Sequence, residues 1–449
     1  MRGRAAAALI ISVVALALVG TWFSAGSGDA PDPAAVTTAG GAGSRLTLGL
    51  ADEVFLSGGD DGDVWLERAR AAGARIVRLG VAWADVEPSQ GTFVWDKVDE
   101  AVRTASRHDL EVLLSVASAP RWAEGPRRPA DAPVGSWQPD SGALGEFAAA
   151  VAQRYSGDTP DLPRVRLWQA WNEPNLARFL SPQWVRGADG WDPASPTLYR
   201  RLYAAFAAGV KAAHADNVVV SGGMAPFGDP SDGGRRMAPV RFLTELLGGD
   251  RLSLDALDHH PYAVGPPEQR ARNPDDASIA DIAKLRGVLD RAGYVKTRLW
   301  VTELAYDSAP PDPDGIPEAR RATWLVRALR ILSRSGVDTV LWYTARDHAP
   351  DPQTGYAGSY QSGLYFADGR PKRALEAFRF PFTAAGGEGW AVAPVDGTMV
   401  VEQQLRDGWR TVARVRATAG RTAQFTGLPN VTAGAMRARI GPMTSLPVS

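Results

Sequence analysis

The chain has 449 residues, of which 45% are hydrophobic and 22% charged, and its formal net charge is −1 at pH 7. This length exceeds one average domain, although a single barrel with insertions can also reach it. The near-neutral charge gives no sign of binding to nucleic acid or to an anionic membrane surface. The absence of cysteine excludes disulfides, thiol catalysis and thiolate metal ligands.

The N-terminal residues have the features of a targeting segment followed by a linker. Arg2 and Arg4 precede an apolar run over residues 5–19, which is typical of a secretory signal peptide within residues 1–27. Because this run approaches the ~20 residues that span a bilayer, an uncleaved membrane anchor is the alternative. Residues 28–44 are rich in Gly, Ala, Pro and Thr and predict a disordered linker. We therefore expect a secreted protein, or one tethered to the outer side of a membrane.

Short apolar segments alternate with helix-patterned segments across residues 45–382. The apolar segments are continuous and rich in β-branched residues, as in parallel strands that are buried on both faces. The expected strands cover residues 46–50, 75–79, 111–116, 165–170, 218–222, 256–260, 299–302 and 339–343. Between them, apolar residues recur at helical spacing, for example at Leu198, Leu202, Phe206 and Val210.

This alternation predicts an α/β protein with a (β/α)8 TIM barrel over residues 45–382. A doubly wound open sheet is the alternative. We disfavour it because no glycine-rich phosphate loop follows the first expected strand.

Residues 383–449 predict a small C-terminal all-β module. Short apolar segments are separated there by Gly, Asp and Pro turns, after an expected hinge at residues 386–390. The expected strands cover residues 392–393, 399–403, 409–415, 423–425 and 435–440. We expect the module to pack on the barrel, and an independent carbohydrate-binding module is the alternative.

Two glutamates stand at the ends of expected strands. Glu173 lies in Trp-Asn-Glu-Pro-Asn at residues 171–175, and Glu303 lies in Val-Thr-Glu-Leu at residues 301–304. Glutamate is almost never fully buried unless it is paired, because moving a carboxylate out of water is costly. The loops after the strands of a barrel build its active site. Two carboxylates in that place suggest a catalytic pair that hydrolyses a glycosidic bond.

These motifs, in this order, resemble those of the clan A glycoside hydrolases, which are retaining β-glycosidases. They are most similar to members of families 39 and 5, and the resemblance covers roughly residues 45–380. The resemblance implies cleavage of β-glycosidic bonds in oligosaccharides or polysaccharides by double displacement, through a covalent glycosyl-enzyme. It implies no cofactor and no metal, and we expect a monomer.

Carried over residue by residue, the resemblance makes Glu173 the general acid/base and Glu303 the nucleophile. Asn172 would bond the 2-hydroxyl of the sugar. Arg78 would lie beside the nucleophile, where its positive charge keeps the carboxylate ionised.

His260 and Tyr262 match the His-x-Tyr pair that follows the sixth strand in the clan. Trp342, on the eighth strand, matches the tryptophan that forms the floor of the sugar subsite. In the loops, Trp122 and Trp184 are expected to offer apolar platforms to sugar rings.

Other functions stay open at this point. A transglycosylase would use the same covalent intermediate, and a glycan-binding barrel without catalysis would use the same scaffold. A metal-dependent hydrolase would use Asp258, His259, His260 and a further histidine. We disfavour it because adjacent strand residues point to opposite faces, so His259 and His260 cannot easily bind the same metal. The sugar, and the choice between exo and endo cleavage, cannot be read from these motifs.

Overall fold

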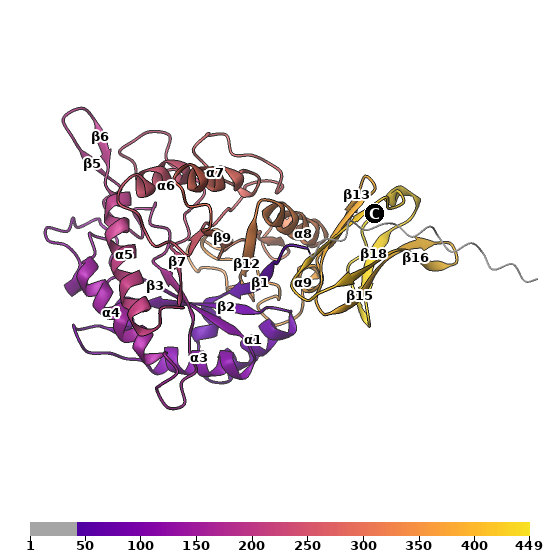
Figure 1. The fold of residues 1–449 in the computed structure, drawn as a ribbon, viewed down its shortest axis with the longest axis horizontal. Helices are drawn as coiled ribbons and strands as arrows, with labels where there is room; N and C mark the ends of the chain where they lie inside the picture. Colours follow the sequence, from indigo (N-terminus) through magenta and orange to yellow (C-terminus); the bar gives the residue numbers. More distant parts are fainter. Residues whose placement is uncertain (1–42) are drawn as a thin grey trace, which may run out of the picture. The chain divides into compact units, whose positions relative to one another are not determined.

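The computed structural model describes residues 43–449, in which parallel strands close into a barrel surrounded by helices (Figure 1). The strand order around the barrel is β1-β12-β9-β8-β7-β4-β3-β2. The strands are β1 Thr47–Ala51, β2 Ile76–Ala82, β3 Glu111–Ala117, β4 Leu167–Ala170, β7 Val218–Ser221, β8 Ala256–Asp258, β9 Arg298–Val301 and β12 Val337–Tyr343. Each expected segment forms one of these strands, and the predicted (β/α)8 barrel is confirmed.

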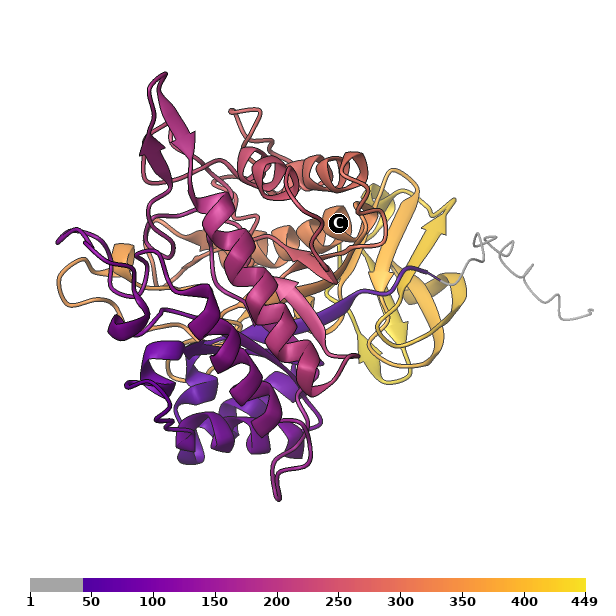
Figure 2. The same ribbon diagram turned by 60° about the vertical axis from the view of Figure 1, so that its left-hand side comes forward.

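The helices lie on the outside of the barrel (Figures 1 and 2). They are α1 Gly59–Ala71, α2 Trp83–Val86, α3 Asp96–Arg107, α4 Ser141–Arg154, α5 Ser195–Ala213, α6 Pro239–Leu247, α7 Ala283–Arg291, α8 Glu318–Arg334 and α9 Arg373–Arg379. In α5, Leu202, Phe206 and Val210 are buried on one face, as their spacing predicts. Pro196 lies in the first turn of α5, where the missing N–H breaks no helical hydrogen bond.

The interior of the barrel is apolar at one end and polar at the other. At the amino-terminal ends of the strands, the interior is filled by an apolar cluster of inward-facing residues: Ile76, Leu113, Leu167, Val220, Ala256, Trp300 and Leu341. Two residues further along four of these strands, the inward positions hold Arg78, Ser115, Gln169 and Asp258, which follows from the period of two in a strand. The polar layer therefore lies at the carboxyl ends of the strands, where the active sites of barrels are found.

The C-terminal residues form two antiparallel sheets. One contains β13 Phe382–Ala385, β14 Glu388–Val392 and β17 Thr422–Thr426, and the other contains β15 Gly397–Leu405, β16 Gly408–Ala417, β18 Met436–Ile440 and β19 Met443–Thr444. The expected hinge at residues 386–390 is wrong. Gly386 and Gly387, with φ of 58° and 79°, form the tight turn between β13 and β14, and Trp390 lies within β14.

This module packs against the amino-terminal end of the barrel strands. Leu46, just before β1, donates its backbone N–H to the Gly420 carbonyl at 2.9 Å, and Thr422 donates to the Ser44 carbonyl at 2.9 Å. Trp390 of the module is only 2% exposed and belongs to the hydrophobic core of the barrel. Because Glu173 and Glu303 follow the opposite ends of the strands, the module does not line the site between them.

No helix within residues 43–449 has both the length and the apolar character needed to cross a membrane. The expected signal peptide or anchor, residues 1–27, lies outside the described residues, as does the expected linker up to residue 42. Secretion and membrane tethering therefore stay predictions.

Candidate active site

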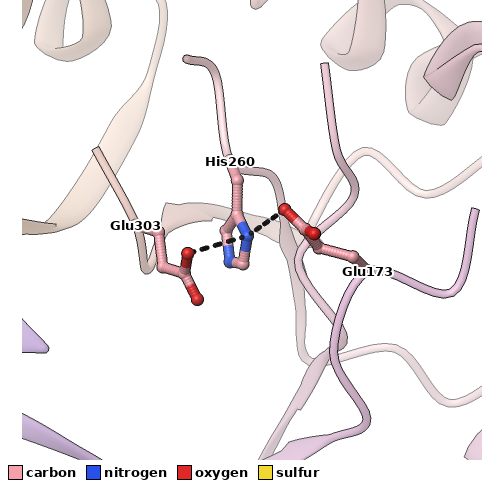
Figure 3. A group of neighbouring side chains, drawn as sticks. All are labelled: Glu173, His260 and Glu303. Atoms are coloured by element: carbon pink, nitrogen blue, oxygen red, sulfur yellow. Dashed lines mark hydrogen bonds and ion pairs between the residues drawn. The ribbon is translucent and has the colours of Figure 1, made fainter. Parts of the chain in front are cut away.

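The two glutamates follow barrel strands at the same end, and their side chains converge. Glu173 follows β4 and Glu303 follows β9. One carboxylate oxygen of each glutamate and one ring nitrogen of His260 lie within 4.8 Å of one another (Figure 3). Carboxyl groups in retaining glycosidases are about 5–5.5 Å apart, whereas those in inverting enzymes are about 6.5–9.5 Å apart. The nearest oxygens of the two glutamates are therefore closer together than the carboxyl groups of inverting enzymes.

The backbone that carries Glu173 has an unusual conformation. Trp171 and Glu173 have positive φ values of 74° and 35°, which are uncommon for residues other than glycine. Neighbouring strands hold this segment: Glu173 donates its N–H to the Gly223 carbonyl at 3.0 Å, and Trp171 donates to the Val116 carbonyl at 2.8 Å. Such conformations persist where the surroundings fix them, and they cluster at active sites.

Donors surround the carboxylate of Glu303. Arg78 Nη1 donates to Oε1 at 2.6 Å, and the Tyr262 hydroxyl donates to Oε2 at 2.8 Å. Burial opposes the ionisation of Glu303, but the charges of His260 and Arg78 and the hydrogen bond from Tyr262 outweigh it. Together they hold the pKa of Glu303 below its usual range. Glu303 is therefore ionised at neutral and mildly acidic pH, as a nucleophile requires.

His260 lies between the two glutamates, as Figure 3 shows. Its Nδ1 is 3.1 Å from Glu173 Oε1 and 3.6 Å from Glu303 Oε2, while its Nε2 is 3.1 Å from Thr302 Oγ1. Complete burial lowers the pKa of His260, but the neighbouring carboxylates of Glu303, Asp258 and Glu173 outweigh this and raise it to about 10. A doubly protonated imidazole has only donors, so His260 offers an N–H to the carboxylates.

Glu173, His260 and Glu303 form the group whose spacing could hold an ion within residues 43–449. Their polar atoms already interact within the protein. His260 contacts Glu173 and Thr302, and both oxygens of Glu303 accept hydrogen bonds. His259 does not join the group, because its Nε2 contacts the Ala277 carbonyl at 2.7 Å.

Only one of the two polar atoms of the Asn172 side chain is hydrogen-bonded within the described residues. Its Oδ1 accepts a hydrogen bond from Arg78 Nη2 at 2.8 Å, which fixes the orientation of the amide. Its Nδ2 has no hydrogen-bond partner within residues 43–449, and it is available to a sugar hydroxyl.

Two buried residues of the polar layer, Gln169 and Asp258, connect the site and were missed as supporting residues by the sequence analysis. Gln169 Oε1 accepts from Arg78 Nε at 2.6 Å, and Gln169 Nε2 donates to Asp258 Oδ2 at 2.5 Å. Asp258 also accepts the Thr302 N–H at 2.9 Å and lies 3.4 Å from His260. Both residues could have been found in the sequence as polar residues at inward-facing positions of apolar strands, because a buried polar group is costly unless it is hydrogen-bonded.

The structure corrects the predicted role of Trp342. This side chain is 1% exposed, packs in the core between sheet and helices, and donates its Nε1–H to the Ser362 carbonyl at 2.7 Å. Because Leu341 faces the barrel interior, Trp342 faces outward and Tyr343 faces inward again. Burial and the negative charge of Glu303 raise the pKa of Tyr343, so Tyr343 is the aromatic residue of β12 that lies near the nucleophile.

The predicted platforms Trp122 and Trp184 are largely covered by protein. Trp184, in the hairpin of β5 Trp184–Arg186 and β6 Trp191–Pro193, is 8% exposed and belongs to the hydrophobic core, which corrects its prediction as a sugar platform. Trp122 is partly buried against Trp83 and donates its Nε1–H to the Glu87 carbonyl at 3.2 Å. In both cases the surrounding loops use the ring for packing.

Gly223 leaves the space that His260 occupies. A Cβ at this position would overlap the His260 ring and the Asp258 carboxylate. We expect Gly223→Ala to displace His260 and to lower kcat by about 10²-fold, because small displacements at a catalytic centre are costly. Steady-state kinetics and the melting temperature test this. Gly62→Ala, in helix α1 on the outside of the barrel, is the control, since a Cβ there meets only two backbone carbonyl oxygens at 3.9 Å, an ordinary contact distance. Equal activity of the two variants would contradict the prediction.

The hydrogen bond from Tyr262 to Glu303 predicts a pH effect. Tyr262→Phe removes a donor that favours the ionised carboxylate, so the pKa of Glu303 rises. The acid limb of the pH profile of kcat/KM reports the nucleophile of the free enzyme, and we expect this limb to move to higher pH. An acid limb that stays in place or moves to lower pH would show that Tyr262 does not control this ionisation.

Comparison with protein-family models matches one short stretch of this chain. Residues 62–126 match the family model of glycoside hydrolase family 42, described as β-galactosidase. This stretch contains Arg78 but neither glutamate. A β-xylosidase from Geobacillus stearothermophilus is 25% identical over 266 residues, which are 55% of this chain and 46% of the relative. The chain therefore spans about half the length of this curated relative.

Solved structures extend the similarity across the fold. A family 39 glycoside hydrolase from Bacteroides cellulosilyticus matches with a TM-score of 0.57 and 18% identity, over 86% of this chain and 81% of that chain. A monomeric β-xylosidase from Caulobacter crescentus matches with a TM-score of 0.56 and 15% identity, over 86% of this chain and 98% of that chain. At such identities the structures establish the fold. Together with the sequence matches, they confirm the predicted resemblance of this chain to the glycoside hydrolases of clan A.

Proposed function

We propose that this protein is a retaining glycoside hydrolase that cleaves β-glycosidic bonds in oligosaccharides or polysaccharides. The observation that carries the proposal is the pair of carboxylates within 4.8 Å, one of which is held ionised by Arg78 and Tyr262. A retaining enzyme forms a covalent glycosyl-enzyme and then hydrolyses it. These two steps require one ionised carboxylate and one carboxyl that can exchange a proton.

In the first step, Glu303 attacks the anomeric carbon while Glu173 gives its proton to the departing oxygen. The bond from the anomeric carbon to the leaving oxygen breaks, and an ester bond to Glu303 forms. Glu173 is then ionised, and the Nδ1–H of His260, 3.1 Å away, stabilises the new charge. His260 therefore serves as a fixed donor shared by the two carboxylates as negative charge moves between them.

In the second step, Glu173 takes a proton from water, and the oxygen of that water attacks the anomeric carbon. The ester bond to Glu303 breaks, and the sugar leaves with its original configuration. Throughout both steps, the free Nδ2 of Asn172 can donate to the 2-hydroxyl, a contact that strengthens in the transition state. The matched relative is described as a β-xylosidase and the matched family model as β-galactosidase, so xylosides and galactosides are the first substrates to test.

A panel of aryl β-glycosides tests the proposal, with the xyloside, galactoside, glucoside and mannoside as members and Glu303→Gln as the inactive control. We expect turnover of at least one member by the native protein and none by the variant. Nuclear magnetic resonance of the first product then identifies its anomer. A first product of inverted configuration would contradict the double displacement. Silence on aryl glycosides and on β-linked polysaccharides would favour a glycan-binding barrel.

We also propose that the protein acts outside the cell, on the basis of the arginines and the apolar run within residues 1–27. Fusion of residues 1–44 to a reporter that is active only after export tests this. Export of the reporter is the expected result, and a reporter retained in the cytoplasm would contradict the proposal.

A further inference from the structure

Tyr360 is an exposed aromatic residue in the loop between β12 and α9, at the end of the barrel that carries the glutamates. The residue is 43% exposed. Within residues 43–449, Trp191 is the other exposed aromatic residue, and the remaining phenylalanine, tyrosine and tryptophan side chains are buried or partly buried. A ring that the protein leaves uncovered can offer its face to a ligand.

The ring of Tyr360 lies close to the segment that carries the nucleophile. Its centroid is 5.0 Å from that of Tyr343, and the two rings meet edge to face at 85°. Tyr343 in turn donates its backbone N–H to the carbonyl of Leu304, the residue after Glu303, at 3.0 Å. One side chain therefore separates the ring of Tyr360 from the backbone next to the nucleophile.

Both catalytic carboxylates act on the hydroxyl of Tyr360. Burial raises the pKa of this group, and the negative charges of Glu303 and Glu173 raise it further, against the opposing charge of Arg178. The two glutamates follow different strands, β9 and β4. A hydroxyl that responds to both of them lies on the side of its loop that faces the catalytic centre.

The backbone just after Tyr360 is held by cations that are themselves buried. Lys372 is 3% exposed, and its Nζ donates to the Gln361 carbonyl at 2.9 Å. Arg321 is fully buried and donates to the carbonyls of residues 362 and 363 at 2.8 and 2.7 Å. These contacts fix the path of the chain at residues 361–363.

Two carboxylates complete this cluster. The Gln361 N–H donates to Asp307 Oδ1 at 2.8 Å, and Asp347, which is 2% exposed, pairs with Lys372 at 2.6 Å. Because taking charges out of water is costly, a buried ion pair adds little to the stability of a fold. Its clear effect here is to hold Tyr360 in one position, and a group that is already fixed loses less entropy when a ligand binds.

We propose that Tyr360 is a substrate-binding residue, whose fixed ring packs against the apolar C–H face of a sugar unit bound at the catalytic centre. An aromatic ring suits this contact because it offers a broad apolar surface with a polar edge. Asp307 acts as a positioning residue for this ring, through the backbone of Gln361. The inference rests on the proposed function and adds to it a contact that the matched motifs do not contain.

Binding to an inactive protein tests the contact separately from catalysis. The protein carries Glu303→Gln, and the probes are the methyl β-glycosides of xylose, galactose, glucose and mannose with the corresponding β-1,4-linked disaccharides. Saturation-transfer nuclear magnetic resonance identifies the probes that bind, and titration gives their Kd. We expect Tyr360→Ala to weaken the binding of these probes about tenfold.

Two control variants separate the ring from its hydroxyl and from its place in the fold. Tyr360→Phe keeps the ring and should bind within about twofold of the native affinity. Trp409→Ala removes a partly buried aromatic ring from β16 of the C-terminal module and should leave binding unchanged. Melting temperatures of all variants show that each one is folded.

A double-mutant cycle tests the positioning role of Asp307. Asp307→Ala removes the acceptor of the Gln361 N–H and is expected to weaken binding about threefold, whereas Asp307→Asn keeps an oxygen acceptor and should restore the affinity. When Tyr360→Ala is already present, Asp307→Ala should cause no further loss, because it acts through the ring. An additional loss in the double variant would overturn the positioning role.

The remaining outcomes decide the contact itself. Equal affinity of Tyr360→Ala and the parent for every bound probe would overturn it, as would a loss in Tyr360→Phe as large as that in Tyr360→Ala. Failure of all probes to bind would also overturn it. Turnover of aryl glycosides by the native protein is measured alongside. Binding that depends on the ring without any turnover would reject the proposed function and leave the contact in place.

Discussion

Replacing Glu303 with alanine is expected to lower kcat/KM on aryl β-glycosides by about 10⁴-fold or more, because no covalent intermediate can form. The carboxylate is fixed by Arg78 at 2.6 Å and by Tyr262 at 2.8 Å, and no other described carboxylate occupies that place. Stopped assays over hours measure the residual rate. Glu388→Ala, which removes an exposed carboxylate of the C-terminal module, is the control and should keep native activity.

Azide provides the second part of this test. In Glu303→Ala the small anion can occupy the space of the lost carboxylate and attack the anomeric carbon from the same face. The expected product is a glycosyl azide of inverted configuration, formed together with a partial recovery of the rate. A variant that keeps a tenth of the native activity, or an azide of retained configuration, would remove Glu303 from the role of nucleophile.

The second large effect is expected for Glu173→Ala, and it should depend on the leaving group. The loss of a general acid costs about 10²- to 10⁴-fold where the departing oxygen needs a proton. A strongly activated phenol leaves without this help, so kcat/KM for a dinitrophenyl glycoside should change little. A plot of log kcat/KM against the acidity of the leaving group should therefore be steep for the variant and shallow for the native protein.

The two variants can be told apart by their azide products. Removal of Glu173 opens the face from which water attacks the glycosyl-enzyme, so azide should give a product of retained configuration. Equal losses of kcat/KM on activated and unactivated substrates would contradict the assignment of Glu173 as the acid. They would indicate instead that Glu173 mainly maintains the position of His260, its neighbour at 3.1 Å.

The sequence was sufficient to predict the barrel because each strand is a continuous apolar run with a helical stripe beside it. Both glutamates could also be found, because each one ends such an apolar run, where a carboxylate is costly unless it is paired or has a function. Arg78, His260 and Tyr262 were placed through the resemblance, and the structure brings them into contact with the glutamates.

The remaining features depend on direction and distance, which residue types do not give. Trp342 was chosen because tryptophan suits a sugar ring, but the alternation along β12 turns it outward and brings Tyr343 to the site. Gln169 could not be assigned in the same way, because its two partners, Arg78 and Asp258, come from strands far apart in the sequence.

The C-terminal sheets are hydrogen-bonded to the residues just before β1, so the barrel and the C-terminal module depend on each other for stability. A fragment that ends before Phe382 loses the strand partners of Ser44 and Leu46 and uncovers apolar surface where Trp390 had packed. A binding domain on a flexible linker can be exchanged between genes without harm. Exchanging this C-terminal module is expected to destabilise the catalytic barrel, because the module supplies part of the barrel's core. Barrel and appendage are therefore expected to melt in a single transition and to be transferred together by recombination.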